Sequence, residues 1–282
     1  MKYLKYIPAA MLAAFALPAS AQDAEPPKPI TVSGSVGLVS DYRFRGVSQS
    51  DEELAVQGGF TIAHESGVYI GTWGSNLAGW GTFGGANMEL DLVAGYKRTF
   101  DAVTVDIGAT WYMYPGGFDN TDFIEPYIKV SGTLGPASLT AGLAYAPKQE
   151  ALGAWYFNGT SAFNGVYDDP GDKNDNLYLW VDGTAGVPNT PITLKGHVGF
   201  SKGNSGLGPF ATSVAPTGEY MDWLLGADLA VPGTPLTLGV AYVDTDINDN
   251  EAFYLQPSFS KGQDGDGSIA NGKVVVSLTA VF

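Results

Sequence analysis

Charged side chains recur at every second position in several segments of this chain. Such spacing places them on one face of a β-strand, where they would form a polar surface. They comprise eight acids and five bases, and because charged rings select ions in pores, the acid excess predicts a mild preference for cations. The alternative is that many of these charges pair across strands and only tie a wall together. The candidate pore-lining residues are Asp41, Arg43, Arg45, Glu89, Asp91, Lys97, Asp106, Glu125, Lys129, Asp182, Lys195, Asp222 and Asp228.

Other kinds of chemistry find little support. The chain has two histidines and no cysteine, and it lacks a Gly-rich phosphate loop, a metal-ligand spacing and a nucleophile elbow. His197 shares a face with Lys195, which favours neutral polar lining. Glu89 and Asp91 could suit general acid–base catalysis, but no catalytic partner of known geometry accompanies them. We therefore interpret them as residues that line the polar surface. A net charge of −15 without a Lys/Arg cluster argues against nucleic acid as a partner. We therefore expect that the protein is not an enzyme and that it binds no cofactor and no metal.

The N-terminal residues 1–21 predict a cleavable signal peptide. Lys2 and Lys5 precede a mostly apolar core at 7–17, and Ala19, Ser20 and Ala21 supply the small residues of a cleavage site. The apolar core is shorter than the roughly 18 residues of a membrane helix. Residues 22–30 are a Pro-rich lead-in to the fold. The protein is therefore expected to be exported. Because it has no cysteine, disulfides cannot contribute to its stability.

The charged positions must be carried by strands, because apolar residues alternate with polar ones from residue 31 to the C-terminus. Mean hydropathy is +0.02, yet no later segment approaches a membrane helix, so the apolar residues are dispersed. Most predicted segments are near the roughly 9–11 residues that a tilted strand needs to cross a bilayer. Strands are predicted at 31–46, 54–64, 67–73, 86–97, 103–114, 123–134, 137–146, 175–187, 192–202, 220–231, 236–246 and 273–282.

The connections between these strands alternate strictly between short and long. Short turns are expected at 65–66, 98–102, 135–136, 188–191 and 232–235, and two of them share nearly the same sequence, at 187–194 and 231–238. An even-stranded barrel with both termini in the periplasm has this arrangement, with short turns inside and long loops outside. The fold prediction is an all-β protein over 31–282, a transmembrane antiparallel β-barrel of about twelve strands. The rival class is a secreted β-sandwich that binds carbohydrate.

Aromatic residues at the strand ends favour the membrane barrel, because rings suit the headgroup level of a bilayer. The last strand, 274–282, alternates throughout and ends in Phe282. It resembles the terminal strand of outer-membrane proteins, whose final aromatic residue is recognised by the barrel-assembly machinery. Phe282 is therefore a candidate assembly signal. The expected lipid-facing aromatics are Tyr42, Phe44, Trp111, Tyr145, Phe200 and Tyr242 at the outer ends, and Tyr96 and Phe282 at the opposite ends.

Several segments resemble the TorF family of proteins described as porins. They are 34–49, which includes the run from Asp41 to Gln49, then 68–76, then Glu89 to Asp91 with Gly95 and Tyr96, and the tail 274–282. The resemblance spans the mature chain and is clearest before residue 115. It implies an outer-membrane barrel of a Gram-negative bacterium, without an assigned substrate.

These observations together predict passive diffusion of small hydrophilic solutes or ions, with a mild cation preference. Asp41, Arg43 and Arg45 would form a constriction near the outer mouth, and the long connection at 147–174 could close the pore. The expected partners are outer-membrane lipids, lipopolysaccharide, the barrel-assembly machinery and small solutes. The alternative is a barrel that serves as an adhesin, a receptor or a structural protein without an open pore.

Overall fold

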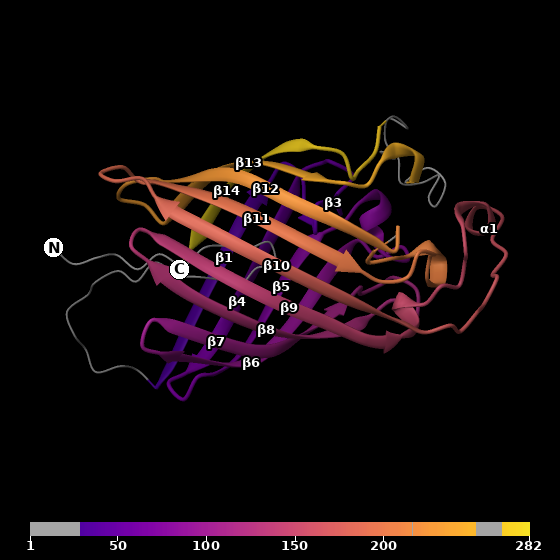
Figure 1. The fold of residues 1–282 in the computed structure, drawn as a ribbon, viewed down its shortest axis with the longest axis horizontal. Helices are drawn as coiled ribbons and strands as arrows, with labels where there is room; N and C mark the ends of the chain where they lie inside the picture. The colour runs from indigo at the N-terminus through magenta and orange to yellow at the C-terminus, as the bar shows by residue number, and fades with distance from the viewer. Residues whose placement is uncertain (1–28, 216, 252–266) are drawn as a thin grey trace.

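Twelve strands pair in sequence order and close on themselves into one antiparallel barrel (Figure 1). The computed structural model describes residues 29–215, 217–251 and 267–282, so the predicted signal peptide lies outside the described residues. The barrel strands are β1 (Ile30–Val39), β4 (Ala55–His64), β5 (Val68–Asn76), β6 (Met88–Phe100), β7 (Val103–Met113), β8 (Phe123–Leu134), β9 (Ala137–Gln149), β10 (Asn174–Gly186), β11 (Ile192–Lys202), β12 (Glu219–Ala230), β13 (Leu236–Thr245) and β14 (Lys273–Val281). The predicted fold class is confirmed.

The smaller elements lie in the connections. They are β2 (Arg43–Phe44), β3 (Val47–Ser48), η1 (Gly79–Thr82), η2 (Glu150–Leu152), α1 (Gly159–Phe163) and η3 (Pro209–Ala211). Among the described residues, no helix is long and apolar enough to cross a membrane.

The predicted strands agree with the observed ones with a single large exception. Strands β8 and β11 have the predicted bounds, and most others differ by a few residues at an end. The first strand, predicted at 31–46, ends at Val39. Residues after it leave the wall, and the β2–β3 pair forms a separate two-stranded sheet. This part of the strand prediction is wrong.

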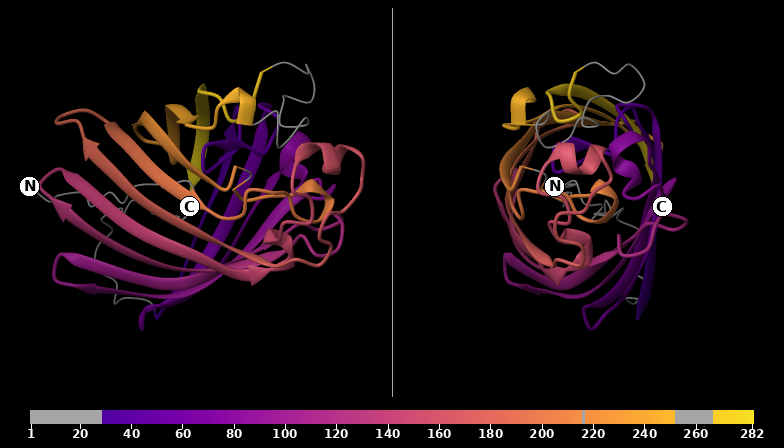
Figure 2. Two further views of the ribbon diagram at one scale, coloured as in Figure 1. Left: turned by 45° about the vertical axis from the view of Figure 1, so that its right-hand side comes forward. Right: turned by 90° about the vertical axis from the view of Figure 1, so that its right-hand side faces the viewer.

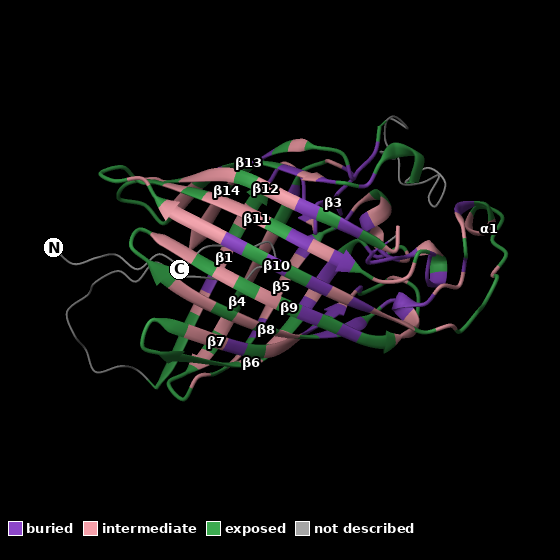
Figure 3. Cartoon of the chain, in the orientation of Figure 1, coloured by how far each residue is buried: buried purple, intermediate pink, exposed green. Residues whose placement is uncertain are grey.

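The alternating pattern places the apolar residues outside and the polar residues inside. Val36, Ile70 and Ile107 are each more than half exposed, while the inner-face residues Asp91 and Asp182 are buried. Figure 3 shows exposed and buried residues alternating along the strands, with the buried ones gathered toward one end of the barrel. A water-soluble sandwich would bury its apolar face instead, so that alternative is wrong.

The two ends of the barrel differ. Short turns and the C-terminus lie at one end, here called the turn end (Figure 1). The connections 40–54, 77–87, 114–122 and 150–173 lie at the other, here called the loop end, with the described residues 203–215, 217–218, 246–251 and 267–272. Figure 2 shows the loop end face-on, with the connection that carries α1 in front of the barrel opening. The predicted alternation of short and long connections is confirmed.

The two turns of similar sequence have the same geometry. In one, the amide of Val187 donates to Ile192 over 2.8 Å, and in the other Val231 donates to Leu236 over 2.9 Å. Asn189 and Gly233 stand at equivalent positions with φ of 62° and 77°, a region that these residue types tolerate. The repeated sequence therefore specifies one turn twice, and each turn fixes the register of its hairpin.

The barrel closes between β1 and β14. Five residue pairs join these strands, from Ser35 opposite Val281 to Val39 opposite Ser277. Beyond them, Phe282 exchanges two backbone hydrogen bonds with Gly34, at 2.9 and 3.0 Å. The C-terminal residue thus completes the closing seam, while its role as an assembly signal stays a prediction.

Large aromatic side chains on the inner face lie over glycines of the neighbouring strand. Trp180 faces Gly142, and the same holds for Tyr69 with Gly95 and Tyr127 with Gly108. A Cβ atom on Gly142 would stand 2.2 Å from Cζ2 of Trp180. Glycine therefore leaves the room that lets each ring lie against the wall.

Replacing Gly142 by valine should destabilise the barrel, because the Trp180 ring would have to leave its site. We expect the free energy of unfolding, measured by urea titration in lipid vesicles, to fall by about 1–3 kcal/mol. The control is Gly186→Val on the same sheet, where a Cβ atom would meet no atom within 4 Å. Equal losses for the two variants would contradict the role given to the ring.

Candidate functional site in the barrel lumen

The first connection, residues 40–54, folds back into the barrel, and we call it the lumen hairpin. Its turn is formed by Arg45 and Gly46, with φ of 48° and 81°. A Cβ atom on Gly46 would stand 2.4 Å from Cγ2 of Thr245 on β13, so only glycine allows this close approach. Other hairpin residues contact the inner faces of β6, β8 and β10. The hairpin therefore lies inside the barrel, surrounded by its wall, and not above its opening.

Arg43 fixes the base of the lumen hairpin. Its guanidinium donates to Asp41 over 2.5 Å and to Glu52 over 3.0 Å. It also donates to the backbone carbonyls of Ile269 and Asn271, at 2.8 and 3.0 Å. Both Asp41 and Arg43 are almost fully buried. These contacts join the hairpin to the last loop-end connection, and the buried guanidinium of Arg43 is not open to a solute.

Arg45 joins the tip of the hairpin to the opposite wall. Its Nη2 donates to both carboxylate oxygens of Glu125 on β8, each over 2.7 Å. The guanidinium also lies over the ring of Tyr178 on β10, 4.1 Å from its centroid. Burial alone would lower the pKa of Arg45, but the Glu125 carboxylate beside it holds that pKa above its ordinary value. Arg45 is therefore charged and anchored across the lumen.

Asp41, Arg43 and Arg45 were predicted on the wall at the mouth of the pore. They lie instead on the lumen hairpin, inside the barrel. Tyr42 and Phe44, predicted to face lipid, are also inside: Tyr42 donates to Glu89 over 2.9 Å, and Phe44 packs edge-on against Tyr112. The reason is that the alternation continues through a reversal of the chain, which the pattern alone does not reveal.

Glu89 and Asp91 form an acidic pair on the inner face of β6. Both side chains are buried, and within the described part of the chain neither has an ion-pair partner among the bases. The Oδ1 atom of Asp91 has no hydrogen-bond partner there either. This pair is therefore a concentration of acidic groups without a neighbouring base at the loop end of the lumen.

Other predicted pore-lining residues pair across neighbouring strands. Asp106 and Lys129 stand directly opposite each other on β7 and β8, with 3.3 Å between Nζ and Oδ2, and Tyr69 also donates to Asp106 over 2.6 Å. Lys195 donates to Asp228 over 2.6 Å. Lys97 is exposed near the turn end. Pairing across strands, weighed above as the alternative, thus accounts for many of the charges.

His197 lies between two carboxylates on the inner face. Its Nδ1 atom is 2.6 Å from Asp182 on β10, and its Nε2 atom is 3.0 Å from Asp222 on β12. The hydroxyl of Tyr178 is 2.8 Å from the same Nε2 atom. His197 was predicted as neutral lining, and its two acidic partners come from strands on both sides. Tyr178 links this group to Arg45, a connection that the sequence did not indicate.

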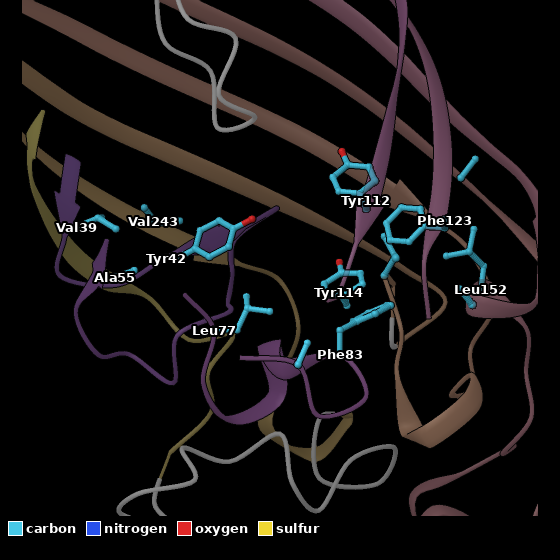
Figure 4. Packing of buried hydrophobic residues seen from close by; sticks show 14 of the residues in the cluster. Val39, Tyr42, Ala55, Leu77, Phe83, Tyr112, Tyr114, Phe123, Leu152 and Val243 are labelled. Atoms are coloured by element: carbon cyan, nitrogen blue, oxygen red, sulfur yellow. The ribbon is translucent and has the colours of Figure 1, made fainter. Parts of the chain in front are cut away.

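Aromatic rings and the lumen hairpin fill the loop end of the lumen. Tyr112 stacks on Phe123 and Phe83 stacks on Tyr114, each with centroids 4.5 Å apart (Figure 4). A cavity of about 20 Å³ remains beside them, lined in part by Glu89, and it could hold about one water molecule. These side chains and the hairpin therefore narrow the lumen at the loop end.

The connection 150–173 belongs to the segment 147–174 that was predicted to close the pore. It lies over the edge of the barrel at the loop end, here called the rim. Ala151 and Leu152 pack into the apolar cluster at the loop end, and Tyr156 pairs with Leu207 of a neighbouring connection. Segment 40–54 enters the lumen and contacts β6, β8 and β10 there. Within the described ranges, no group of three or more His, Cys, Asp or Glu is placed to hold a metal ion.

Comparisons with known proteins give one family and several solved structures. A family model described as a bacterial protein of unknown function (Gcw_chp) matches residues 23–282, and no curated protein matches the chain. An outer-membrane channel from Pseudomonas putida is similar in structure, with 9% identity, a TM-score of 0.45, and coverage of 92% of this chain and 100% of that one. OmpT of Vibrio cholerae has 9% identity, a TM-score of 0.41 and coverage of 92% and 100%.

A porin is also similar, with 12% identity, a TM-score of 0.41, and coverage of 81% of this chain. The chain spans 62% of the length of that porin. The likeness extends to the barrel fold and to nothing finer. The resemblance to the TorF family is not confirmed and stays a prediction.

Proposed function

Because the chain belongs to the Gcw_chp family of bacterial proteins of unknown function, its role must be inferred from its own residues, and we propose that it is an outer-membrane channel. It would pass small hydrophilic solutes or ions with a mild preference for cations, and it would not be an enzyme. The resemblance to TorF proteins described as porins supports this proposal.

The outer surface supports a place in the membrane. Its apolar residues face outward on every barrel strand, and Trp111, Tyr145 and Tyr242 lie exposed toward the loop end, with Tyr96 toward the turn end. Aromatic girdles at both edges of an apolar band are typical of outer-membrane barrels. The short turns and the predicted signal peptide support an orientation with the turn end in the periplasm.

The observation that carries the proposal is the polar, charged interior of a closed barrel whose exterior is apolar. Arg43 and Arg45 face buried carboxylates, and Lys129 and Lys195 each have an acidic partner. Among the described residues, Glu89 and Asp91 have no base beside them. Because adjacent buried carboxylates share a proton, the pair would carry about one negative charge beside the narrowed part of the lumen. A negative potential there would favour cations over anions.

Planar-bilayer recording of the purified mature chain tests this proposal. We expect discrete channels whose reversal potential under a salt gradient shows a preference for cations. Glu89→Gln with Asp91→Asn should bring the cation-to-anion permeability ratio close to one, because the unpaired charge is removed.

The matched control removes two exposed acids at the rim, by Glu219→Gln with Asp249→Asn. These charges are screened by solvent ions, so this variant should keep the preference of the unmodified protein. A silent bilayer would contradict the channel, and an anion preference would contradict the role of the acidic pair.

A further inference from the structure

The loop end exposes a group of phenylalanines that do not belong to the apolar outer face of the barrel strands. We call it the aromatic loop surface. Phe163 is 82% exposed on α1, and Phe157, Phe118 and Phe210 are 58%, 55% and 41% exposed. Figure 1 shows α1 beyond the ends of the strands, so the apolar band of the wall does not account for this exposure. Exposed apolar patches on protein surfaces commonly mark interaction sites.

These four rings lie on three connections that contact one another. Phe118 of 114–122 stacks on Phe210 of 203–218, with ring centroids 4.0 Å apart. The connection 150–173 joins the same group through Tyr156 and Leu207, which exchange two backbone hydrogen bonds at 2.9 and 2.8 Å. The rings therefore come from connections that contact one another at the loop end.

Local structure holds the rings in place before any partner arrives. Phe210 has a φ of 56°, in the left-handed region where a bulky residue is strained. The amide of Phe157 donates to Asp168 over 2.8 Å, and Asn158 caps α1 by accepting from Ser161 over 3.0 Å. A pre-organised surface loses less conformational entropy on binding, which favours a docking role.

The charges around the aromatic loop surface identify the kind of partner. The connections 77–87, 114–122, 150–173 and 203–218 contain one base, Lys173, and it pairs with Glu150 over 3.2 Å. Their acids are Asp119, Asp122, Glu150, Asp168, Asp169 and Asp172. A second copy of this surface would bring the same negative charges together, and lipid phosphates would be repelled. A partner with both cationic and apolar side chains fits both features.

We infer that the aromatic loop surface docks a cationic amphipathic peptide segment of another molecule. The apolar side chains of the segment contact the four phenylalanines, and its lysines or arginines face the surrounding carboxylates. This function goes beyond solute passage and does not depend on it. It also makes the loop end a receptor surface, whichever solute the lumen passes.

The test measures binding of a fluorescent helix-forming peptide of leucine and lysine to the full mature chain in zwitterionic nanodiscs. Fluorescence anisotropy at physiological ionic strength gives the affinity, with empty nanodiscs as the reference. Phe157→Ser with Phe163→Ser should weaken binding by about tenfold or more, as loss of central apolar contacts commonly does. Asp119→Asn with Asp169→Asn should weaken it by about fivefold, because long-range attraction is reduced.

The matched control is Phe100→Ser with Leu134→Ser, which removes two exposed apolar residues at the turn end and should leave the affinity unchanged. A peptide with glutamine in place of every lysine should bind weakly. Equal binding to empty nanodiscs, or a loss with the Asp variants but not with the Phe variants, would overturn the inference. Unchanged bilayer conductance of the Phe variants would show that they fold, and a silent unmodified channel would leave the binding result standing.

Discussion

Replacing residues 41–53 by a short glycine–serine connection should raise the single-channel conductance several-fold. The lumen hairpin occupies the interior beside β6, β8 and β10, and conductance grows as the narrowest part of a pore widens. Val39 and Ala55 are paired across β1 and β4, so a connection of about four residues can join the two strands without breaking the barrel. Planar-bilayer recording at fixed voltage and salt gives the measurement.

The control shortens the rim instead, by replacing residues 156–170 with the same glycine–serine connection. This segment lies outside the wall, so its loss should change the conductance far less than loss of the hairpin. If the two deletions have equal effects, the lumen hairpin is not the constriction. If only the rim deletion opens the pore, the original prediction of a plug at 147–174 is the better one.

The error at the lumen hairpin shows what a period-two pattern can and cannot reveal. Tyr42 and Phe44 alternate with Asp41, Arg43 and Arg45 as they would on a wall strand. The same alternation suits a short hairpin folded into a barrel, because the pattern records strand-like backbone but not which sheet receives it. One available signal was the Arg45–Gly46 pair, where glycine permits the left-handed turn that reverses the chain.

The charge pairs could be predicted only where a short turn fixes the register. Val187 and Ile192 pair across such a turn. Asp182 and His197 each lie five residues further along their strands, so they must stand opposite each other, as they do. Asp222 reaches the same histidine from β12, which follows a long connection. A long connection sets no register, so the sequence did not indicate that contact or the partner of Arg45.

The inside and outside of the wall were predictable for a different reason. Periodicity identifies two faces but not which one meets solvent, so the alternation alone left the sandwich open. The alternation of short and long connections distinguished the two folds, since a barrel that spans a membrane has all its short turns at one end. This argument rests on features outside the strands, and Trp111 and Tyr145 are exposed as it requires.

Breaking the pair between Arg45 and Glu125 should be among the most destabilising single changes in the chain. Their side chains are 1% and 2% exposed, and Nη2 of Arg45 contacts both carboxylate oxygens. Replacing Arg45 by methionine leaves the Glu125 charge buried without a partner, which costs about 3–5 kcal/mol. Glu125→Leu should cost a similar amount, because it leaves the guanidinium buried without its carboxylate. Urea unfolding in lipid vesicles gives these values.

Combining the two substitutions should restore much of the lost stability, because an apolar pair replaces two charges that were costly to bury. The control pair is Lys202 and Glu219 at the rim, 3.6 Å apart with both side chains more than 60% exposed. Breaking that pair by Lys202→Met should cost less than about 1 kcal/mol, since solvent screens it. If the double variant is as unstable as the sum of the single ones, the two side chains do not interact. The lumen hairpin would then be held chiefly by Arg43 at its base.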